Sequence, residues 1–150
     1  PPRPPLRRRP QQTRMGIAST QLRIENEELH MVKNTNPVQE KSYAFAIRMV
    51  KLYRHLSVHQ KEFVLSRQLL RSGTSIGANI EEAIGGQSRA DFASKMSIAY
   101  KESRETRYWL RLLKDTAYLT PKEYDSIAAE ADELCRMLSS ILITTRQSQP

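Results

Sequence analysis

The fold of this chain is decided by residues 69–113, which contain SIGANIEEA at residues 75–83 and KESRETRYWL at residues 101–110. Both segments place small and apolar residues at helical spacing, with carboxylates among them. The pair Gly85-Gly86 lies between the two segments and interrupts the helical pattern. We therefore predict two long helices that meet at this turn and pack closely against each other.

A further helix precedes this pair. Asn36 is a good N-cap, and Pro37 suits the first helical position, so a first helix is expected to begin at Pro37. The second helix is expected to begin at Ser57, where Gln60 completes a capping box after a very short link. Within that second helix, Gly73 and Gly77 each cost about 1 kcal/mol relative to alanine, which predicts close approach of a neighbouring helix.

The third and fourth helices also have clear starts. Ser88, with Asp91 three residues later, restarts the helix after the glycine pair, and the pattern ends near Thr116. Thr120–Glu123 is a capping box with proline at the first helical position, and the pattern of the fourth helix continues to Arg146. Four amphipathic helices with short links predict an all-α, antiparallel up-down-up-down four-helix bundle.

The first helix carries two adjacent apolar stripes. Together they cover more of its surface than a monomeric bundle helix needs, so we expect burial against a second subunit as well as against the core. The first stripe comprises Tyr43, Ala46, Ile47, Val50 and Tyr53, and the second comprises Phe45, Met49, Leu52 and Leu56. The sequence does not decide which face forms the oligomer.

The bundle is expected over residues 37–146, between an N-terminal extension at residues 1–36 and a frayed tail at residues 147–150. Residues 1–14 are rich in proline and hold five arginines and no acid, which predicts a disordered or extended arm. Such an arm is typical of nucleic-acid binding. The alternative that we favour is that much of residues 1–30 lies upstream of a native start at Met31, which the intact mass of the natively expressed protein would test.

Composition narrows the class of protein. The chain has a formal charge of +8, of which residues 31–150 contribute +5 from 18 basic and 13 acidic side chains. The single Cys135 cannot form an internal disulfide, which favours a reducing cytoplasm. No apolar run approaches the roughly 20 residues that a membrane span needs, so we expect no membrane partner.

Catalytic and cofactor motifs are absent from the sequence. No glycine-rich phosphate loop follows a strand, and no nucleophile motif links the Ser, His and acidic residues. His55 and His59 have the spacing of a metal pair with Glu62 nearby, but the helix break expected at Ser57 would separate them. We therefore expect no enzyme activity, no metal and no cofactor.

Polar residues converge where the second and third helices pack. Carboxylates at such a seam can act in catalysis, but a polar network that fixes the register of the helices is the favoured interpretation. Its expected members are Ser75, Asn79, Glu82, Lys101, Glu102, Glu105 and Tyr108.

Two basic strips are candidates for contact with phosphate groups, and a solvated surface paired with neighbouring acids is the alternative for both. One lies on the first helix and comprises Lys41, Arg48 and Lys51; the other lies on the third helix and comprises Arg104, Arg107, Arg111 and Lys114.

The segments at 75–83 and 101–110, with DF at 91–92 and IA at 98–99, resemble a family of bacterial four-helix-bundle proteins. This family includes the proteins encoded in intervening sequences of 23S ribosomal RNA genes, also called the S23 family, and is distantly similar to the accessory variability determinant of diversity-generating retroelements. The resemblance covers about residues 43–142. Gly77 stands where many relatives have proline, and Ala83 where many have glycine.

The resemblance implies a homopentameric barrel with a basic surface suspected of binding nucleic acid, and it supplies no catalytic residues. Combined with the basic strips, it predicts a non-enzymatic oligomeric protein that contacts structured RNA or DNA. The alternative is a protein-interaction scaffold, or an accessory factor for a mobile-element polymerase.

Overall fold

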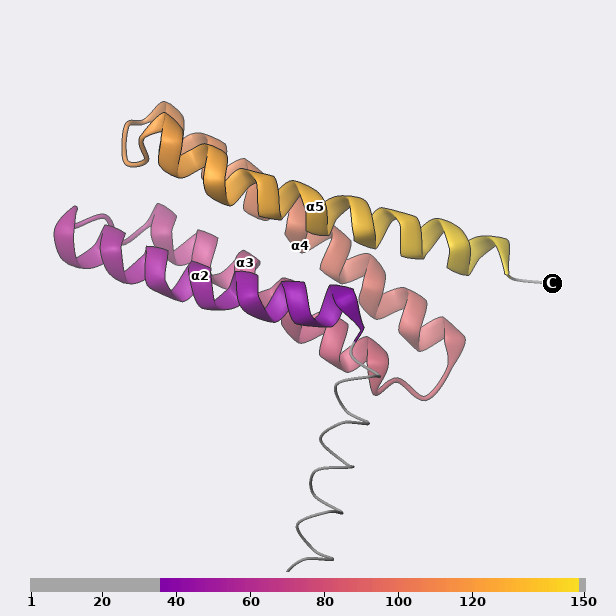
Figure 1. Ribbon diagram of the computed structural model, residues 1–150. Helices are drawn as coiled ribbons and strands as arrows, with labels where there is room; N and C mark the ends of the chain where they lie inside the picture. The colour runs from indigo at the N-terminus through magenta and orange to yellow at the C-terminus, as the bar shows by residue number, and fades with distance from the viewer. Residues whose placement is uncertain (1–35, 149–150) are drawn as a thin grey trace, which may run out of the picture. The chain divides into compact units, whose positions relative to one another are not determined.

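The computed structural model describes residues 36–148 (Figure 1). The expectations for the proline- and arginine-rich arm and for a start at Met31 lie outside the described residues. Within residues 36–148 the chain forms four helices and no strand: α2 (Pro37–His59), α3 (Leu65–Ile84), α4 (Arg89–Asp115) and α5 (Pro121–Gln147). None of these helices is long and apolar enough to cross a bilayer.

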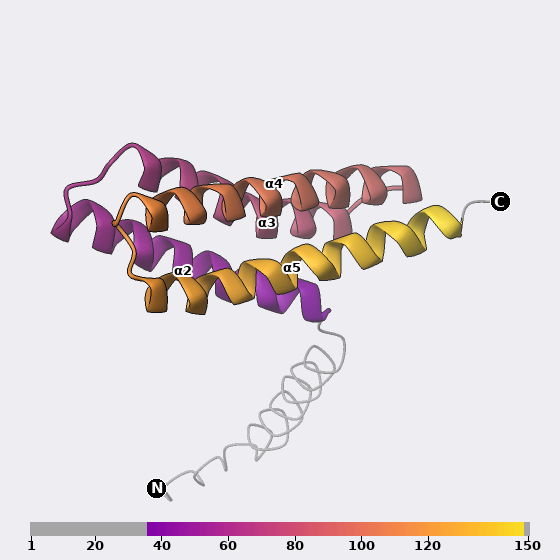
Figure 2. The same cartoon turned by 90° about the horizontal axis from the view of Figure 1, so that it is seen from above.

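The four helices form the predicted four-helix bundle. Each helix packs against the next along the chain, and α5 returns to contact α2, so that the bundle closes (Figures 1 and 2). The links are short, which makes consecutive helices antiparallel. The homopentameric assembly stays a prediction.

Local capping explains where three of the helices begin. The Asn36 side chain accepts a hydrogen bond from the Val38 N–H at 3.2 Å, and the Ser88 hydroxyl accepts one from the Asp91 N–H. The capping box at Thr120–Glu123 is complete, with both of its reciprocal hydrogen bonds formed. These three predicted starts are confirmed.

The predicted start of the second helix at Ser57 is wrong. Helix α2 continues to His59, and the Ser57 hydroxyl donates to the carbonyl of Tyr53 at 2.8 Å, so Ser57 lies in the interior of a helix. Lys61, with φ of 54°, then turns the chain. Ser57 and Gln60 resemble a capping box in sequence only, because serine can bond back to its own helix instead of capping a new one.

Glu62 is the residue that starts α3. Its carboxylate accepts three backbone hydrogen bonds, from the N–H groups of Val64, Leu65 and Ser66 at 3.0, 2.8 and 2.7 Å. Burial of Glu62 opposes ionisation, but these N–H donors outweigh it and lower the pKa of the carboxyl below its usual value. The adjacent Phe63 is 48% exposed.

Of the two apolar stripes of α2, only one contributes its large side chains to the core. Its second stripe is buried, whereas three large side chains of its first stripe, Tyr43, Ile47 and Val50, are exposed by 68%, 41% and 36%. The core residues of α2 and α3 are Val38, Phe45, Met49, Leu52, Leu56, Leu69, Ile76, Ile80 and Ala83; those that follow are Met96, Ala99, Leu110, Leu113, Leu119, Ile127, Ala131, Leu134, Leu138 and Leu142.

Small side chains allow α3 to lie close to both of its neighbours. Gly73 faces the buried Met49 of α2, and Gly77 faces Ser42 of the same helix. On the other side of α3, the hydroxyls of Ser72 and Thr106 lie 3.0 Å apart in the interface with α4. Both glycines therefore have the packing role that their cost in a helix predicts.

Helix α4 ends in a Schellman motif. The Tyr118 N–H donates to the carbonyl of Leu113 at 2.9 Å, and the Ala117 N–H donates to that of Lys114 at 3.0 Å. Ala117 has φ of 65°, a conformation that glycine adopts with less strain.

Candidate nucleic-acid interface

The basic residues of α4 lie along one edge of its exposed surface. Arg104, Arg107, Arg111 and Lys114 follow one another in steps of three and four, which places them in one row on a helix. The first three are exposed and Lys114 is half-buried. The row borders α5, and a groove runs between the two helices.

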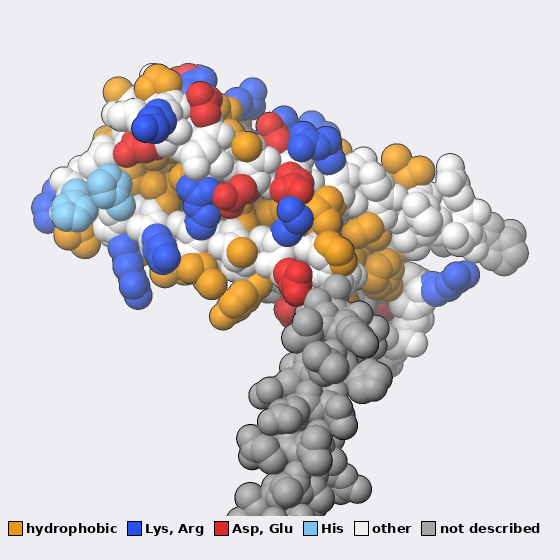
Figure 3. Space-filling view, in the orientation of Figure 1, with side chains coloured by type: hydrophobic (Ala, Val, Ile, Leu, Met, Phe, Trp, Pro, Cys, Tyr) orange, Lys and Arg blue, Asp and Glu red, His pale blue; other side chains and the backbone are white. Residues whose placement is uncertain are grey.

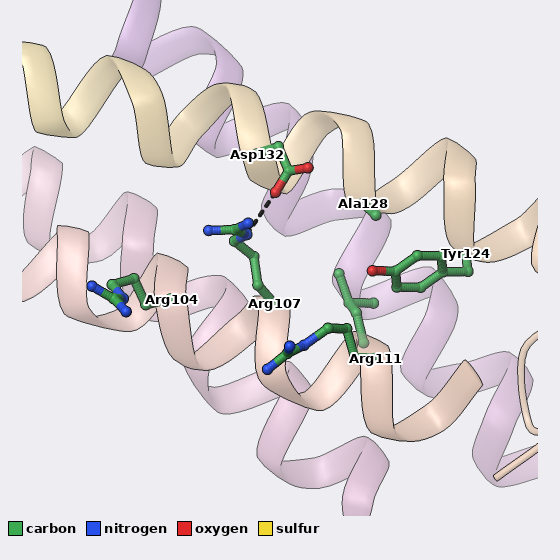
Figure 4. Close-up of a pocket in the computed structure, with 7 residues that line it drawn as sticks. Arg104, Arg107, Arg111, Tyr124, Ala128 and Asp132 are labelled. Carbon is green, nitrogen blue, oxygen red and sulfur yellow. Dashed lines mark ion pairs between the residues drawn. The ribbon is translucent and has the colours of Figure 1, made fainter. Parts of the chain in front are cut away.

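One hollow in this groove has a volume of about 280 Å³ and is lined by Arg104, Arg107, Leu110 and Arg111 of α4 and by Tyr124, Ala128 and Asp132 of α5. Figure 4 shows Arg107 reaching across to Asp132, with Arg104 and Arg111 on either side of it along α4. The Arg107 Nε lies 2.6 Å from Asp132 Oδ1, and its Nη1 donates to Cys135 Sγ at 3.9 Å. Arg107 is thus held in position.

The groove continues toward the C-terminal end of α5 in a second hollow of about 570 Å³. Arg104 lines both hollows, and its guanidinium lies 6.0 Å from the centre of the Tyr100 ring. The lining residues of the second hollow are Ser97, Tyr100, Lys101, Arg104, Ser139, Leu142, Ile143 and Arg146. We refer to the two hollows together as the α4–α5 groove.

The α4–α5 groove is strongly basic. Five of its lining residues are basic and one, Asp132, is acidic, which is a formal charge of +4. In the part of the chain that the structure describes, no carboxylate lies within 4.0 Å of the charged groups of Arg104, Arg111 or Lys101. These cations are available to an anionic ligand.

Lys114 stands at the other end of the row. Its ammonium group lies 4.5 Å from the centre of the Tyr124 ring and 3.6 Å from a carboxylate oxygen of Asp115. The ring and the neighbouring acid already stabilise its charge. Lys114 is therefore the least available member of this row.

The basic strip on α2 is largely neutralised by α5. Lys41 pairs with Glu133 at 2.7 Å, and Arg48 pairs with Glu130, while Lys51 has no acidic partner among the described residues. Figure 3 shows acidic and basic side chains next to one another on the face that α2 and α5 share. The alternative that we gave for this strip, a surface paired with neighbouring acids, therefore holds for Lys41 and Arg48.

The polar network between α3 and α4 is organised by a residue that the sequence interpretation missed. Arg71 pairs with Glu105 and lies 3.5 Å from Glu102, so one guanidinium bridges both carboxylates. The Trp109 Nε1 also donates to Glu105 at 3.0 Å. Burial opposes ionisation of Glu105, yet Trp109 and Arg71 together lower its pKa below the usual value.

Glu102 behaves differently from Glu105. Its burial and the negative charge of Glu105 raise its pKa above the usual value, although the nearby Arg71 acts in the opposite direction. The two carboxylates share one cation, which favours ionisation of Glu105 over that of Glu102. The ion pairs of Arg71 with Glu102 and Glu105 thus link α3 to α4.

The other expected members of the network lie elsewhere. The Asn79 amide donates to the carbonyl of Ser75 within α3, and Glu82 pairs with Lys95 near the glycine turn. Tyr108 is 48% exposed and its ring packs edge-on against Trp109 at 4.9 Å between centres. Lys101 lines the α4–α5 groove. The predicted single network is therefore wrong in its extent, because these side chains face different neighbours.

Residues 34–140 match the family described as 23S rRNA-intervening sequence protein. The chain belongs to this family. A crystal structure from the S23 ribosomal protein family of Bacteroides thetaiotaomicron VPI-5482, described as a protein with unknown function, is 55% identical, with a TM-score of 0.69; the similarity covers 70% of this chain and 97% of that one. No curated protein matches the chain.

In this 23S rRNA-intervening sequence family member, His55 and His59 share α2, with ring centres 5.2 Å apart. The break that we expected between them does not exist, but the nearby Glu62 caps α3 and is not free to complete a metal site. Within residues 36–148, no group of three or more His, Cys, Asp or Glu side chains is placed to hold a metal ion.

One signal in the sequence could have identified the missed residues. In an antiparallel helix pair, residues at equal distances from the turn lie opposite each other. The midpoint of the residue numbers of Arg71 and Glu102 is 86.5, and that of Ser72 and Thr106 is 89. Both midpoints lie close to the Gly85-Gly86 turn. Pairing residues about this centre brings Arg71 to the two carboxylates.

Proposed function

We propose that this chain is a non-enzymatic, oligomeric cytoplasmic protein that binds the phosphate backbone of structured nucleic acid through the α4–α5 groove. The observation that supports this most strongly is the charge of the groove, with five basic side chains against the one carboxylate of Asp132. The family description, which names an intervening sequence of 23S ribosomal RNA, makes structured RNA the first ligand to test.

The arrangement suits contact with phosphate groups rather than with base edges. Arg104 and Arg111 are seven residues apart, or about 10.5 Å along the helix axis at 1.5 Å per residue. That distance corresponds to about three base pairs at the rise of 3.4 Å along the axis of a B-form DNA duplex. Arg107 between them is held by Asp132, so Arg104 and Arg111 are the main phosphate donors. Contacts of this kind position a duplex without reading its sequence.

The α2 strip is the weaker candidate for the same role. Phosphate groups would have to displace Glu133 from Lys41 and Glu130 from Arg48, whereas Arg104 and Arg111 have no acidic partner to lose in the part of the chain described. We therefore assign the primary contact to α4 and a secondary one, at most, to Lys51.

Self-association is the second part of the proposal, and the exposed stripe of α2 supports it. Tyr43, Ile47 and Val50 present apolar surface to solvent on one face of a single helix. A ring of copies would repeat each weak groove and raise avidity without any new contact. Sedimentation equilibrium should show an oligomer, a pentamer if the family resemblance holds, and Ile47→Glu with Val50→Glu should shift it toward monomer. A wild-type monomer at every concentration would contradict this part.

Reversal of charge tests the groove. The double variant Arg104→Glu/Arg111→Glu should weaken binding of a hairpin RNA by at least tenfold in fluorescence anisotropy. The matched control is Arg54→Glu/Arg67→Glu, which changes the net charge equally at exposed positions of α2 and α3 outside the groove. Equal losses in both variants would point to net charge alone, and an unchanged affinity in the first would refute the groove.

A protein-interaction scaffold is the alternative, because the same exposed stripe on α2 could dock a protein partner. Salt separates the two functions. Phosphate contacts predict an affinity that falls steeply with ionic strength, whereas an apolar docking surface predicts little change.

A further inference from the structure

A hollow on the opposite flank of α5 lies between α2 and α5, beside the link that follows α4. Its volume is about 500 Å³, and it shares no lining residue with the α4–α5 groove. The lining residues are Arg48, Lys51, Leu52, His55, Leu119, Lys122, Glu123, Ser126 and Ile127. Leu52, Leu119 and Ile127 are core residues, so the base of the hollow is hydrocarbon that belongs to the core.

The rim of this hollow is cationic. Lys51 and Lys122 are exposed, and neither has a carboxylate within 4.0 Å in the described part of the chain. The only lining acid, Glu123, already accepts a hydrogen bond from the Thr120 N–H at 2.8 Å, in the capping box of α5. That acid takes part in the helix start, and the lining residues Arg48, Lys51, Lys122 and Glu123 together carry a formal charge of +2.

One hydroxyl at the rim accepts a hydrogen bond and can donate another. The Arg48 Nη2 donates to Ser126 Oγ at 3.2 Å, which leaves the proton of Ser126 free for another acceptor. Glu130 fixes the same guanidinium. The hollow thus combines an apolar base, two ammonium groups without an ion-pair partner among the described residues, and a hydroxyl, which is the usual composition of a site for an organic ligand.

We propose that this hollow binds a small amphipathic anion, a molecule with a medium-length hydrocarbon body and one carboxylate. The hydrocarbon body lies over the small exposed parts of Leu52, Leu119 and Ile127, and its own removal from water contributes favourable free energy. The carboxylate lies at the rim between Lys51 and Lys122, where the charge is complementary. A cation of the same shape is repelled by that rim. This inference does not depend on nucleic-acid binding by the α4–α5 groove, because the groove and this hollow share no lining residue.

Octanoate is the probe, and the methyl NMR signals of Leu52, Leu119 and Ile127 are the readout in the full chain. Titration of octanoate should shift these signals with saturation, whereas octylammonium, which has the same tail and the opposite charge, should not. Acetate, which lacks the tail, should not saturate them either. Equal binding of octanoate and octylammonium, or octanoate shifts that leave these three methyl signals unmoved, would overturn the proposal.

Two variants complete the test. Lys51→Glu/Lys122→Glu should weaken octanoate binding at least tenfold, and the control Arg67→Glu/Arg136→Glu should change it less than twofold. All four substituted positions are exposed, so the two variants should fold like the wild type. Octanoate affinity that is the same in the first variant as in the wild type would refute the rim as the site of the carboxylate.

Discussion

Replacing Gly73 with alanine should destabilise the bundle, whereas the same replacement at Gly77 should stabilise it. A Cβ at residue 73 would lie 2.5 Å from Met49 Cγ and 2.9 Å from its Sδ, and Met49 is fully buried. A Cβ at residue 77 would meet the carbonyl and hydroxyl oxygens of Ser42 at 3.5 Å, an ordinary contact. The two substitutions are chemically identical and differ only in the space around them.

The expected magnitudes follow from two opposing effects. Alanine favours a helix over glycine by about 1 kcal/mol at either position. Overpacking a well-filled core costs about 1–3 kcal/mol, and only Gly73→Ala incurs that cost. We expect Gly77→Ala to raise the free energy of unfolding by up to about 1 kcal/mol, and Gly73→Ala to lower it by about 1 kcal/mol.

Urea denaturation followed by far-UV circular dichroism measures both values. The protein concentration must be the same for each variant, because self-association makes apparent stability depend on it. The wild-type chain and Gly77→Ala serve as matched references for Gly73→Ala. If both variants gain stability, or both lose the same amount, the packing of α3 against α2 is not as described.

Two further predictions concern helix ends. Glu62→Gln should lower the free energy of unfolding by about 1–2 kcal/mol at neutral pH, because the charged acceptor for the N–H groups at the start of α3 is lost. Folding lowers the pKa of Glu62, so its contribution to stability is present above its unfolded pKa of about 4.5 and is lost as the pH falls through the folded pKa. The free energy of unfolding should therefore fall less in acid for Glu62→Gln than for the wild type. The same pH dependence of stability in both proteins would contradict this. Ala117→Gly should raise stability by about 0.5–1 kcal/mol in thermal denaturation, because φ of 65° strains alanine, and a loss would refute that conformation.

Helix starts that rest on local chemistry were predictable from the sequence. Asn36, Ser88 and Thr120 each cap a helix with a side chain two or three residues from its partner, so the whole motif is visible in a short segment. The start of α3 was missed because Ser57 has two local options, to cap a new helix or to bond back to its own, and only tertiary packing decides between them.

The candidate site was less predictable than the fold. Periodicity placed the basic residues of α4 in one row, but it does not show which helix lies beside them. The partners of a long side chain depend on the opposite helix, which is why the ion pairs of Lys41 and Arg48 with α5 were not distinguished from free cations. Arg71 was missed for the same reason: its two carboxylates lie more than 30 positions away in sequence.

The most direct test of the account is the salt dependence of RNA binding in the full chain, with and without the two groove arginines. The logarithm of the association constant should fall linearly with the logarithm of salt concentration, with a slope of about −0.9 for each phosphate neutralised. Arg104→Gln/Arg111→Gln removes two such contacts and should make that slope shallower by about 1.8. The control Arg54→Gln/Arg67→Gln, at exposed positions of α2 and α3, should leave it unchanged.

This comparison also separates the groove from the arginines of residues 1–14, which are present in every variant. A slope that becomes shallower by about 1.8 only in the groove variant is the result that the account predicts. An identical slope in the wild type and in Arg104→Gln/Arg111→Gln would contradict nucleic-acid binding by the α4–α5 groove.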